Sequence, residues 1–133
     1  MWCEEDEDRW QVSPKDFVHF GSGWACNEKA QRILQPHCEP DVEFLPLLCG
    51  PETYHFLNPA AVIDALDRSR SGYFARREQP EHIIVVVKHI FIPERLQGRT
   101  LFRIPEDNAV FATQSFADLV ERSGLTGIRF FRP

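Results

Sequence analysis

The chain has 133 residues, a length that fits one domain around a single hydrophobic core. Apolar residues at 43% and charged residues at 26% are ordinary values for a globular protein. The formal net charge of -5 offers none of the basic excess typical of nucleic-acid binding, and no apolar run reaches the roughly 18 residues of a membrane span. We therefore expect neither a nucleic-acid nor a membrane partner.

The negative charge is concentrated in one run near the N-terminus, which consists of Glu4, Glu5, Asp6, Glu7 and Asp8. Without these five, the remaining 15 acidic residues balance the 15 basic residues. A terminal run of like charges is usually solvated, so we expect a flexible acidic tail over residues 1–9 and a single domain over residues 10–133. The start lacks the positive charge and apolar stretch of a signal peptide, which predicts a cytoplasmic protein.

The first predicted elements are a short strand and a helix. The stretch "KDFVHFG" predicts a strand that begins near Phe17 and ends at Gly21. In "WACNEKAQRILQP", Asn27 is a candidate N-cap, and apolar residues at i, i+3 and i+4 form one face of a helix. We expect this helix to end at Pro36.

The middle of the chain predicts a hairpin and a second helix. "DVEFLPLLCG" and "ETYHFLN" are two apolar stretches on either side of a Gly-Pro turn, so we expect them to pair. In "NPAAVIDALD", Asn58 as N-cap and Pro59 at the first helical position predict a short helix. Its apolar stripe would contain Val62, Ile63 and Leu66.

The stretch "DRSRSGYFARREQPEH" is polar and predicts an exposed loop. "IIVVVKHIFI" is β-branched and apolar on both faces, so we expect it to lie in the middle of the sheet. "TLFRI" predicts another strand and "PEDN" a turn, and "AVFA" leads to Thr113 as the cap of a helix that Gly124 ends. The last stretch, "GIRFFRP", predicts a final strand buried through Ile128 and either Phe130 or Phe131.

Together these elements predict an α+β fold. We expect a single domain with a mixed or mostly antiparallel sheet of about five to seven strands and two to three short helices.

The sequence contains no convincing catalytic or metal-binding pattern. Its four cysteines form no CxxC pair, which argues against a disulfide framework. The sharpest zinc proposal lacks closely spaced ligand pairs and is rejected; it would use Cys26, His37, Cys38 and Cys49. Asp64 and Asp67 are three residues apart, but the simpler interpretation is a solvent-facing or capping role. We expect no catalytic residue, metal or cofactor.

Several short stretches occur in an order known from one protein family. They are Leu57-Asn58, the "DALD" element Asp64 to Asp67 with Ser71, the strand Phe102 to Ile104, Leu125 to Gly127, and Phe131 with Pro133. Over nearly all of residues 15–133 the chain resembles the bacterial immunity protein family eleven of polymorphic toxin systems. The resemblance implies a non-enzymatic inhibitor that binds and neutralises a cognate toxin. Such a toxin is commonly encoded by a neighbouring gene and delivered by a contact-dependent or type VI secretion system.

An inhibitor of this kind needs a contact surface of roughly 800 Å² with aromatic or arginine anchors. The predicted exposed loop offers such a mixture in Tyr73, Phe74, Arg76 and Arg77, although the two aromatic residues could instead pack beneath the loop. The acidic run from Glu4 to Asp8 would accelerate association with a basic toxin. The inhibitor would act as a monomer or a homodimer.

Two other classes of protein stay open. A small cytosolic enzyme would use a Cys–His pair with Cys26 or Cys38, and it would have a reactive thiol with a lowered pKa. A protein-interaction module without a toxin partner would have no toxin gene beside its own.

Overall fold

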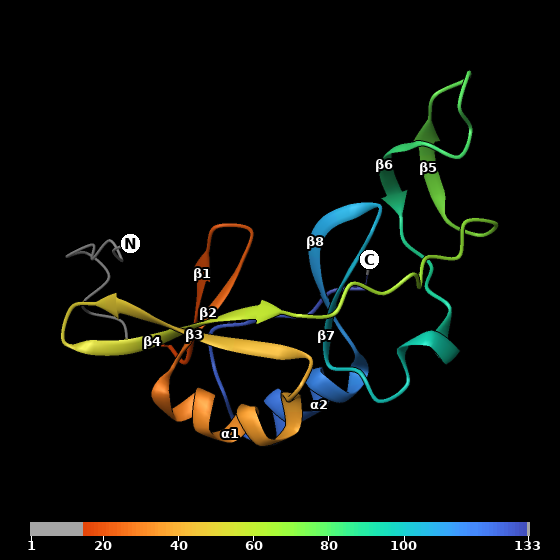
Figure 1. Ribbon diagram of the computed structural model, residues 1–133. Coiled ribbons are helices and arrows are strands. Elements are labelled where there is room, and N and C mark those ends of the chain that lie inside the picture. Colours follow the sequence, from red (N-terminus) through yellow and green to blue (C-terminus); the bar gives the residue numbers. More distant parts are fainter. Residues whose placement is uncertain (1–14, 133) are drawn as a thin grey trace.

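The computed structural model describes residues 15–132, which form eight strands, two α-helices and a 3-10 helix (Figure 1). In chain order these are β1 (Phe17–Phe20), β2 (Gly23–Asn27), α1 (Glu28–Cys38), β3 (Val42–Cys49), β4 (Glu52–Pro59), β5 (Gly72–Ala75), β6 (Ile83–Lys88), the 3-10 helix η2 (Pro93–Leu96), β7 (Leu101–Ile104), β8 (Asp107–Ala112) and α2 (Gln114–Arg122).

The strands form three antiparallel sheets: a four-stranded sheet of order β1-β2-β4-β3, and the two hairpins β5-β6 and β7-β8. The predicted α+β class and the antiparallel pairing are confirmed, and so is the hairpin that β3 and β4 form around Gly50. The eight described strands are divided among these three sheets, the largest of which has four strands.

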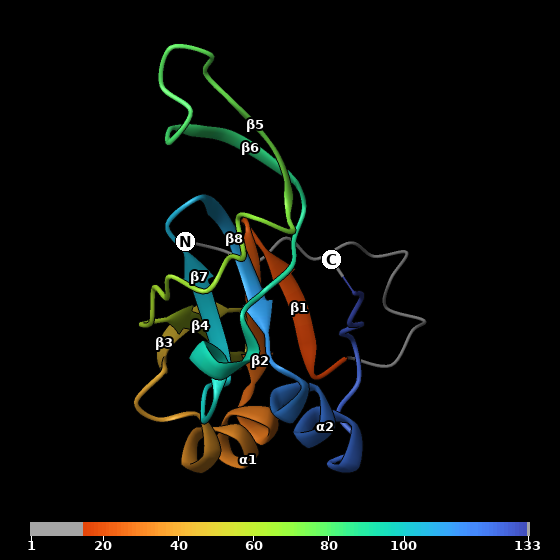
Figure 2. The same ribbon diagram turned by 90° about the vertical axis from the view of Figure 1, so that its right-hand side faces the viewer.

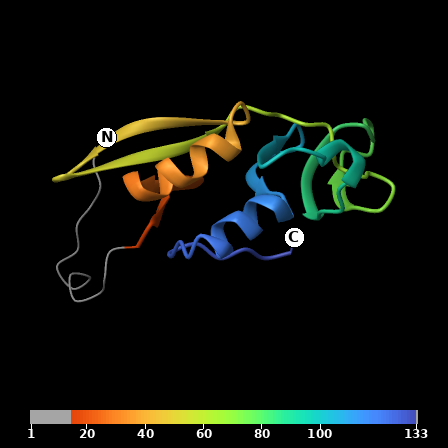
Figure 3. The same ribbon diagram turned by 90° about the horizontal axis from the view of Figure 1, so that it is seen from below.

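Both helices lie on the same side of the strands (Figures 1 and 2), and α1 lies across β3 and β4 (Figure 3). The main core forms between them, where Phe17 of β1, Leu34 of α1 and Phe116 of α2 are fully buried. Each buried side chain of this size contributes roughly 1.5–3 kcal/mol to stability. The apolar stripe that predicted α1 therefore builds the core, together with the face of α2 that carries Phe116, Leu119 and Val120.

Helix α1 begins as predicted, because the Asn27 side chain accepts a hydrogen bond of 2.9 Å from the Ala30 N–H. Its predicted end is wrong by two residues, since Pro36 lies inside the last turn and the helix runs on to Cys38. A proline near the end of a helix removes a single N–H, and the Glu39 N–H still bonds the Gln35 carbonyl at 3.2 Å.

The helix predicted from Asn58 is wrong. Asn58 and Pro59 end strand β4, and residues 60–67 continue as extended chain. This segment bonds to β7, where the Ile63 N–H donates to the Arg103 carbonyl at 2.7 Å and the Arg103 N–H donates to the Ala61 carbonyl at 2.9 Å. Pairing with a strand some 40 residues away outweighs the local cap signal, because it satisfies the backbone groups of both segments.

The strand predicted for the middle of the sheet is misplaced. Strand β6 pairs with β5 alone among the described strands, and the β5–β6 hairpin projects from the rest of the chain (Figures 1 and 2). Val86 packs in a second core cluster with Leu66, Phe102 and Ile104. A β-branched apolar run therefore identified the strand correctly, but it did not determine how many neighbours the strand has.

The predicted final strand is also wrong, because residues 125–132 contain no strand. This segment is held instead by Asp16, whose carboxylate accepts bonds from the Thr126 N–H at 2.9 Å and from the Asn27 side-chain amide at 2.9 Å. The Phe17 N–H also donates to the Thr126 carbonyl at 3.0 Å. Ile128 then packs against the main core, as expected for its apolar character.

Gly127 is the residue that prevents a regular strand here, since its φ of +99° lies in the region that side chains disfavour. A Cβ at this position would lie 2.4 Å from the Phe17 carbonyl oxygen and 2.8 Å from the Lys15 Cβ.

We predict that Gly127→Ala destabilises the protein by about 2–4 kcal/mol, because the new methyl group would clash with the backbone and strain φ. Gly124→Ala is the matched control. Gly124 also has a positive φ, of +69°, but a Cβ there meets nothing within 4 Å, so a loss of only about 1 kcal/mol is expected. Urea unfolding measures both values, and equal losses would contradict the proposed contact with Phe17.

A second prediction concerns the pH dependence of stability. Burial raises the pKa of Asp16, but the hydrogen bonds from Asn27 and Thr126, together with the charge of Lys29, outweigh burial and lower the pKa below its ordinary 3.8. The ionised carboxylate therefore stabilises the fold above about pH 4, and this contribution is lost as the pH falls through the lowered pKa.

We expect Asp16→Asn to be less stable than the wild type by about 1–3 kcal/mol at neutral pH, and the difference to shrink as the pH falls below about 4. Asp67 and Asp107 also have lowered pKa values but are present in both proteins, so their effects cancel in the comparison. Urea unfolding at several pH values tests this, and a difference that does not change with pH would contradict it.

Candidate partner-binding surface

The β5–β6 hairpin has one face packed on the protein and one face open. Tyr73 pairs with Val86 across the two strands, and both contact the second core cluster. Phe74 pairs with Val85, and both are exposed on the opposite face, where Val87 follows. Phe74 is 63% exposed and Val87 is 62% exposed. The outer face of the hairpin therefore consists of apolar side chains open to solvent.

The predicted partner-binding residues are divided between these faces. The stretch predicted to be a loop contains β5, which aims Tyr73 inward and Phe74 outward. Arg76 and Arg77 follow in the exposed turn, and within residues 15–132 neither side chain forms an ion pair. The acidic run from Glu4 to Asp8 lies outside the described residues. A binding role for any of these residues stays a prediction.

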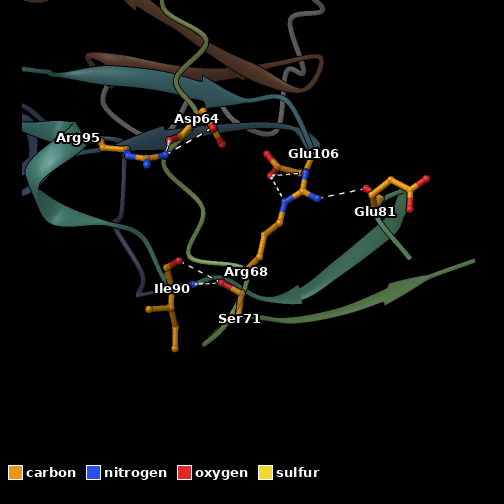
Figure 4. A network of polar contacts seen from close by, with 7 residues as sticks. All are labelled: Asp64, Arg68, Ser71, Glu81, Ile90, Arg95 and Glu106. Atoms are coloured by element: carbon orange, nitrogen blue, oxygen red, sulfur yellow. Dashed lines mark hydrogen bonds and ion pairs between the residues drawn. The ribbon is translucent and has the colours of Figure 1, made fainter. Parts of the chain in front are cut away.

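Polar contacts fix the root of the hairpin to the rest of the chain (Figure 4). Arg68 bonds the Glu106 carboxylate through Nε at 3.3 Å and Nη2 at 3.2 Å, and it donates from Nη1 to the Glu81 carbonyl at 3.1 Å. The Ser71 hydroxyl lies 3.0 Å from both the N–H and the carbonyl oxygen of Ile90. The Arg68–Glu106 bonds connect the segment before β5 to the turn between β7 and β8, and the Ser71–Ile90 bonds join the two segments that enter and leave the hairpin.

A third contact at the root joins His89, just after β6, to the start of β8. The His89 Nε2 lies 2.8 Å from the Asp107 Oδ2. Burial raises the pKa of Asp107, but hydrogen bonds from the Ala109 N–H and from His89 outweigh it, so the pKa is lowered. The imidazole ring also packs 5.0 Å from Phe111, measured between ring centroids. This carboxylate is therefore fully used within the fold.

A groove of about 370 Å³ lies between β6 and the turn that joins β7 to β8. Its lining consists of Ile84, Val85, Val86, Pro105, Glu106, Asp107 and Asn108. The Glu106 side chain is 3% exposed, and its Oε1 atom is buried and makes no hydrogen bond within the described chain. Sequence reasoning missed this groove, because the burial of Glu106 depends on Arg68, 38 residues earlier.

The surroundings of Cys26 and Cys38 argue against nucleophilic catalysis by either thiol. Cys26 and Cys38 are buried, and burial raises the pKa of Cys26 to about 12 and that of Cys38 to about 11. A catalytic thiol requires the opposite shift, because the thiolate is the nucleophile. Neither sulfur makes a hydrogen bond to a histidine in the described chain. Both residues therefore serve the main core as small apolar side chains.

The two aspartates considered for acid–base chemistry have separate structural partners. Asp64 forms an ion pair with Arg95 at 3.5 Å (Figure 4). Asp67 accepts hydrogen bonds from the Ser69 hydroxyl at 2.6 Å and from the Ser69 N–H at 3.1 Å. The hydroxyl bond is the main cause of the lowered pKa of Asp67. Asp67 therefore stabilises the turn that follows it, although the segment is not a helix.

Two further observations concern the described residues alone. Residues 15–132 contain no group of three or more His, Cys, Asp or Glu side chains arranged to hold a metal ion. Neither α1 nor α2 is long and apolar enough to cross a membrane.

The comparison with known families gives a match. The immunity protein family (Imm11) matches residues 11–132, which is nearly the whole chain. The chain therefore belongs to the immunity protein family Imm11. Immunity proteins bind cognate toxins and are generally not enzymes. No curated protein matches the chain.

We predict that the two buried thiols react slowly with iodoacetamide in the folded protein. At pH 8, a shift of the pKa from 9.0 to about 12 lowers the thiolate fraction of Cys26 about 1000-fold, and the shift to about 11 lowers that of Cys38 about 100-fold. Peptide mapping by mass spectrometry, with urea-unfolded protein as the control, resolves each position. Rapid labelling of either residue in the folded state would restore the Cys–His enzyme interpretation.

Proposed function

We propose that the chain binds and neutralises a cognate toxin domain encoded by a neighbouring gene, and so protects the producing cell. The observation that carries this proposal is the family match over residues 11–132. Inhibition would occur by contact with the toxin in the cytoplasm, after a contact-dependent or type VI secretion system has delivered it. The inhibitor itself would supply no catalytic group, metal or cofactor.

We further propose that the outer face and tip of the β5–β6 hairpin contact the toxin. Exposed aromatic and arginine side chains commonly dominate binding energy, and the hairpin carries Phe74, Arg76 and Arg77 together with Val85 and Val87. Tyr73 would support this surface from beneath, since it packs against the second core cluster. The acidic run from Glu4 to Asp8 would accelerate encounter with a basic toxin.

The proposal is tested with the purified protein and the toxin domain encoded by the neighbouring gene. Calorimetry should give a Kd in the nanomolar range, and co-expression should restore growth of cells that produce the toxin. Absence of both binding and rescue would overturn the proposed function.

The contact surface is tested by the double variant Phe74→Ala with Arg77→Ala. Because both side chains are exposed, we expect little change in stability but at least about tenfold weaker toxin binding, equivalent to about 1.4 kcal/mol. Phe131→Ala with Arg129→Ala removes an exposed aromatic ring and an arginine elsewhere and should leave the Kd unchanged. Unchanged affinity of the hairpin variant would place the interface on another surface.

A further inference from the structure

Strand β6 offers an unpaired backbone edge to the groove described above. It pairs with β5 along one edge, and no other described strand pairs with it. Three consecutive residues, Ile84, Val85 and Val86, line the groove. Since successive side chains of a strand point to opposite faces, a cavity lined by three in a row faces the edge of the strand. Unpaired N–H and C=O groups at such an edge are a template for another strand.

The opposite wall of the groove contains a carboxylate with unused hydrogen-bonding capacity. Arg68 occupies the Oε2 atom of Glu106, and the buried Oε1 atom has no partner. A buried carboxylate oxygen without a hydrogen-bond partner destabilises the protein, so a bound donor would recover part of that cost. Asp107, the other acid in the lining, already accepts bonds from His89 and the Ala109 N–H. Glu106 is therefore the acid in the lining with an oxygen to spare, and a ligand would reach that buried oxygen as the side chain turns toward the groove.

We infer that an extended segment of the cognate toxin adds to the free edge of β6 and places a lysine or arginine side chain against Glu106 Oε1. The aliphatic stem of that residue would lie along Ile84 and Pro105, and its charged end would reach the carboxylate. Main-chain pairing with β6 supplies affinity, and the cation at Glu106 supplies specificity. This inference rests on the proposed function and names the mode of binding.

A second copy of the chain fits this groove less well than a toxin segment does. In a full-length antiparallel pair of two β6 strands, Lys88 of one copy would lie opposite Ile83 of the other, at the end of the strand. The groove is lined by the middle residues Ile84 to Val86, where such a pair would bring only apolar side chains. Self-association through β6 therefore leaves Glu106 Oε1 without a cation.

The experiment measures the affinity of the full chain for the neighbouring toxin domain by calorimetry. Glu106→Gln keeps the shape of the side chain and removes its charge, and Ile84→Glu places a charge on a groove-lining strand residue that is 60% exposed. We expect each variant to bind the toxin at least about tenfold more weakly. Because Glu106→Gln also weakens the contact with Arg68, the Tm of each variant is measured and binding is compared at a temperature at which all of them are folded. Glu121→Gln and Leu48→Glu are matched controls at exposed positions away from the hairpin, and they should bind as the wild type does.

Arg68→Gln separates a contact role of Glu106 from a positioning role. If Glu106 acts only by holding Arg68, both variants should lose the same affinity. The inference expects Arg68→Gln to lose less affinity than Glu106→Gln, because the Glu106 carboxylate stays available to the toxin cation. Within the toxin, one Lys→Ala or Arg→Ala variant should be non-additive with Glu106→Gln in a double-mutant cycle.

The outcomes distinguish the possible failures. If the wild type binds the toxin and neither Glu106→Gln nor Ile84→Glu changes the Kd, the groove inference is wrong and the proposed function stands. A wild type that does not bind overturns both. Light scattering that shows a wild-type dimer, which Ile84→Glu converts to a monomer, would assign the edge to a second copy and overturn the toxin assignment.

Discussion

The described fold depends on the carboxylate of Asp16, which connects the two ends of the described chain. It is 8% exposed and accepts hydrogen bonds from the Thr126 N–H, the Thr126 hydroxyl and the Asn27 side-chain amide. The same Asn27 side chain caps α1 through the Ala30 N–H. One buried charge therefore fixes the start of the first helix, the first strand pair and the segment after the second helix. A charge in such a position is tolerated because several donors surround it.

The β5–β6 hairpin, in contrast, buries few side chains. Most of the contacts that stabilise it lie at its root. A two-stranded hairpin is marginal in water when it stands alone. Here Val86 and Tyr73 join the second core cluster, and Arg68 and Ser71 make polar contacts to the segments beside them. This arrangement holds the hairpin while its outer face stays exposed. Exposed apolar edge strands favour aggregation, so retaining one is physically reasonable where a partner covers it.

Local signals in the sequence predicted the elements that depend on local contacts. Helix α1 followed from the Asn27 cap and its apolar stripe, and the β3–β4 hairpin followed from Gly50 between two apolar stretches. The errors arose where distant contacts decide the structure. Residues 60–67 are extended because of Arg103, and the C-terminal segment is bent where Gly127 meets the Phe17 backbone, 110 residues away in the chain. No composition or periodicity rule contains that information.

The charges on and near the hairpin would also affect which toxins the protein binds. A toxin segment with a lysine or arginine would satisfy Glu106, and the acidic run from Glu4 to Asp8 would attract the same basic partner. Arg76 and Arg77 at the tip of the hairpin would repel a partner that is basic throughout. Under this proposal, a cognate toxin would combine a basic segment at the groove with neutral or acidic residues at the tip. Attraction at one position and repulsion at another together separate a cognate toxin from its relatives better than either does alone.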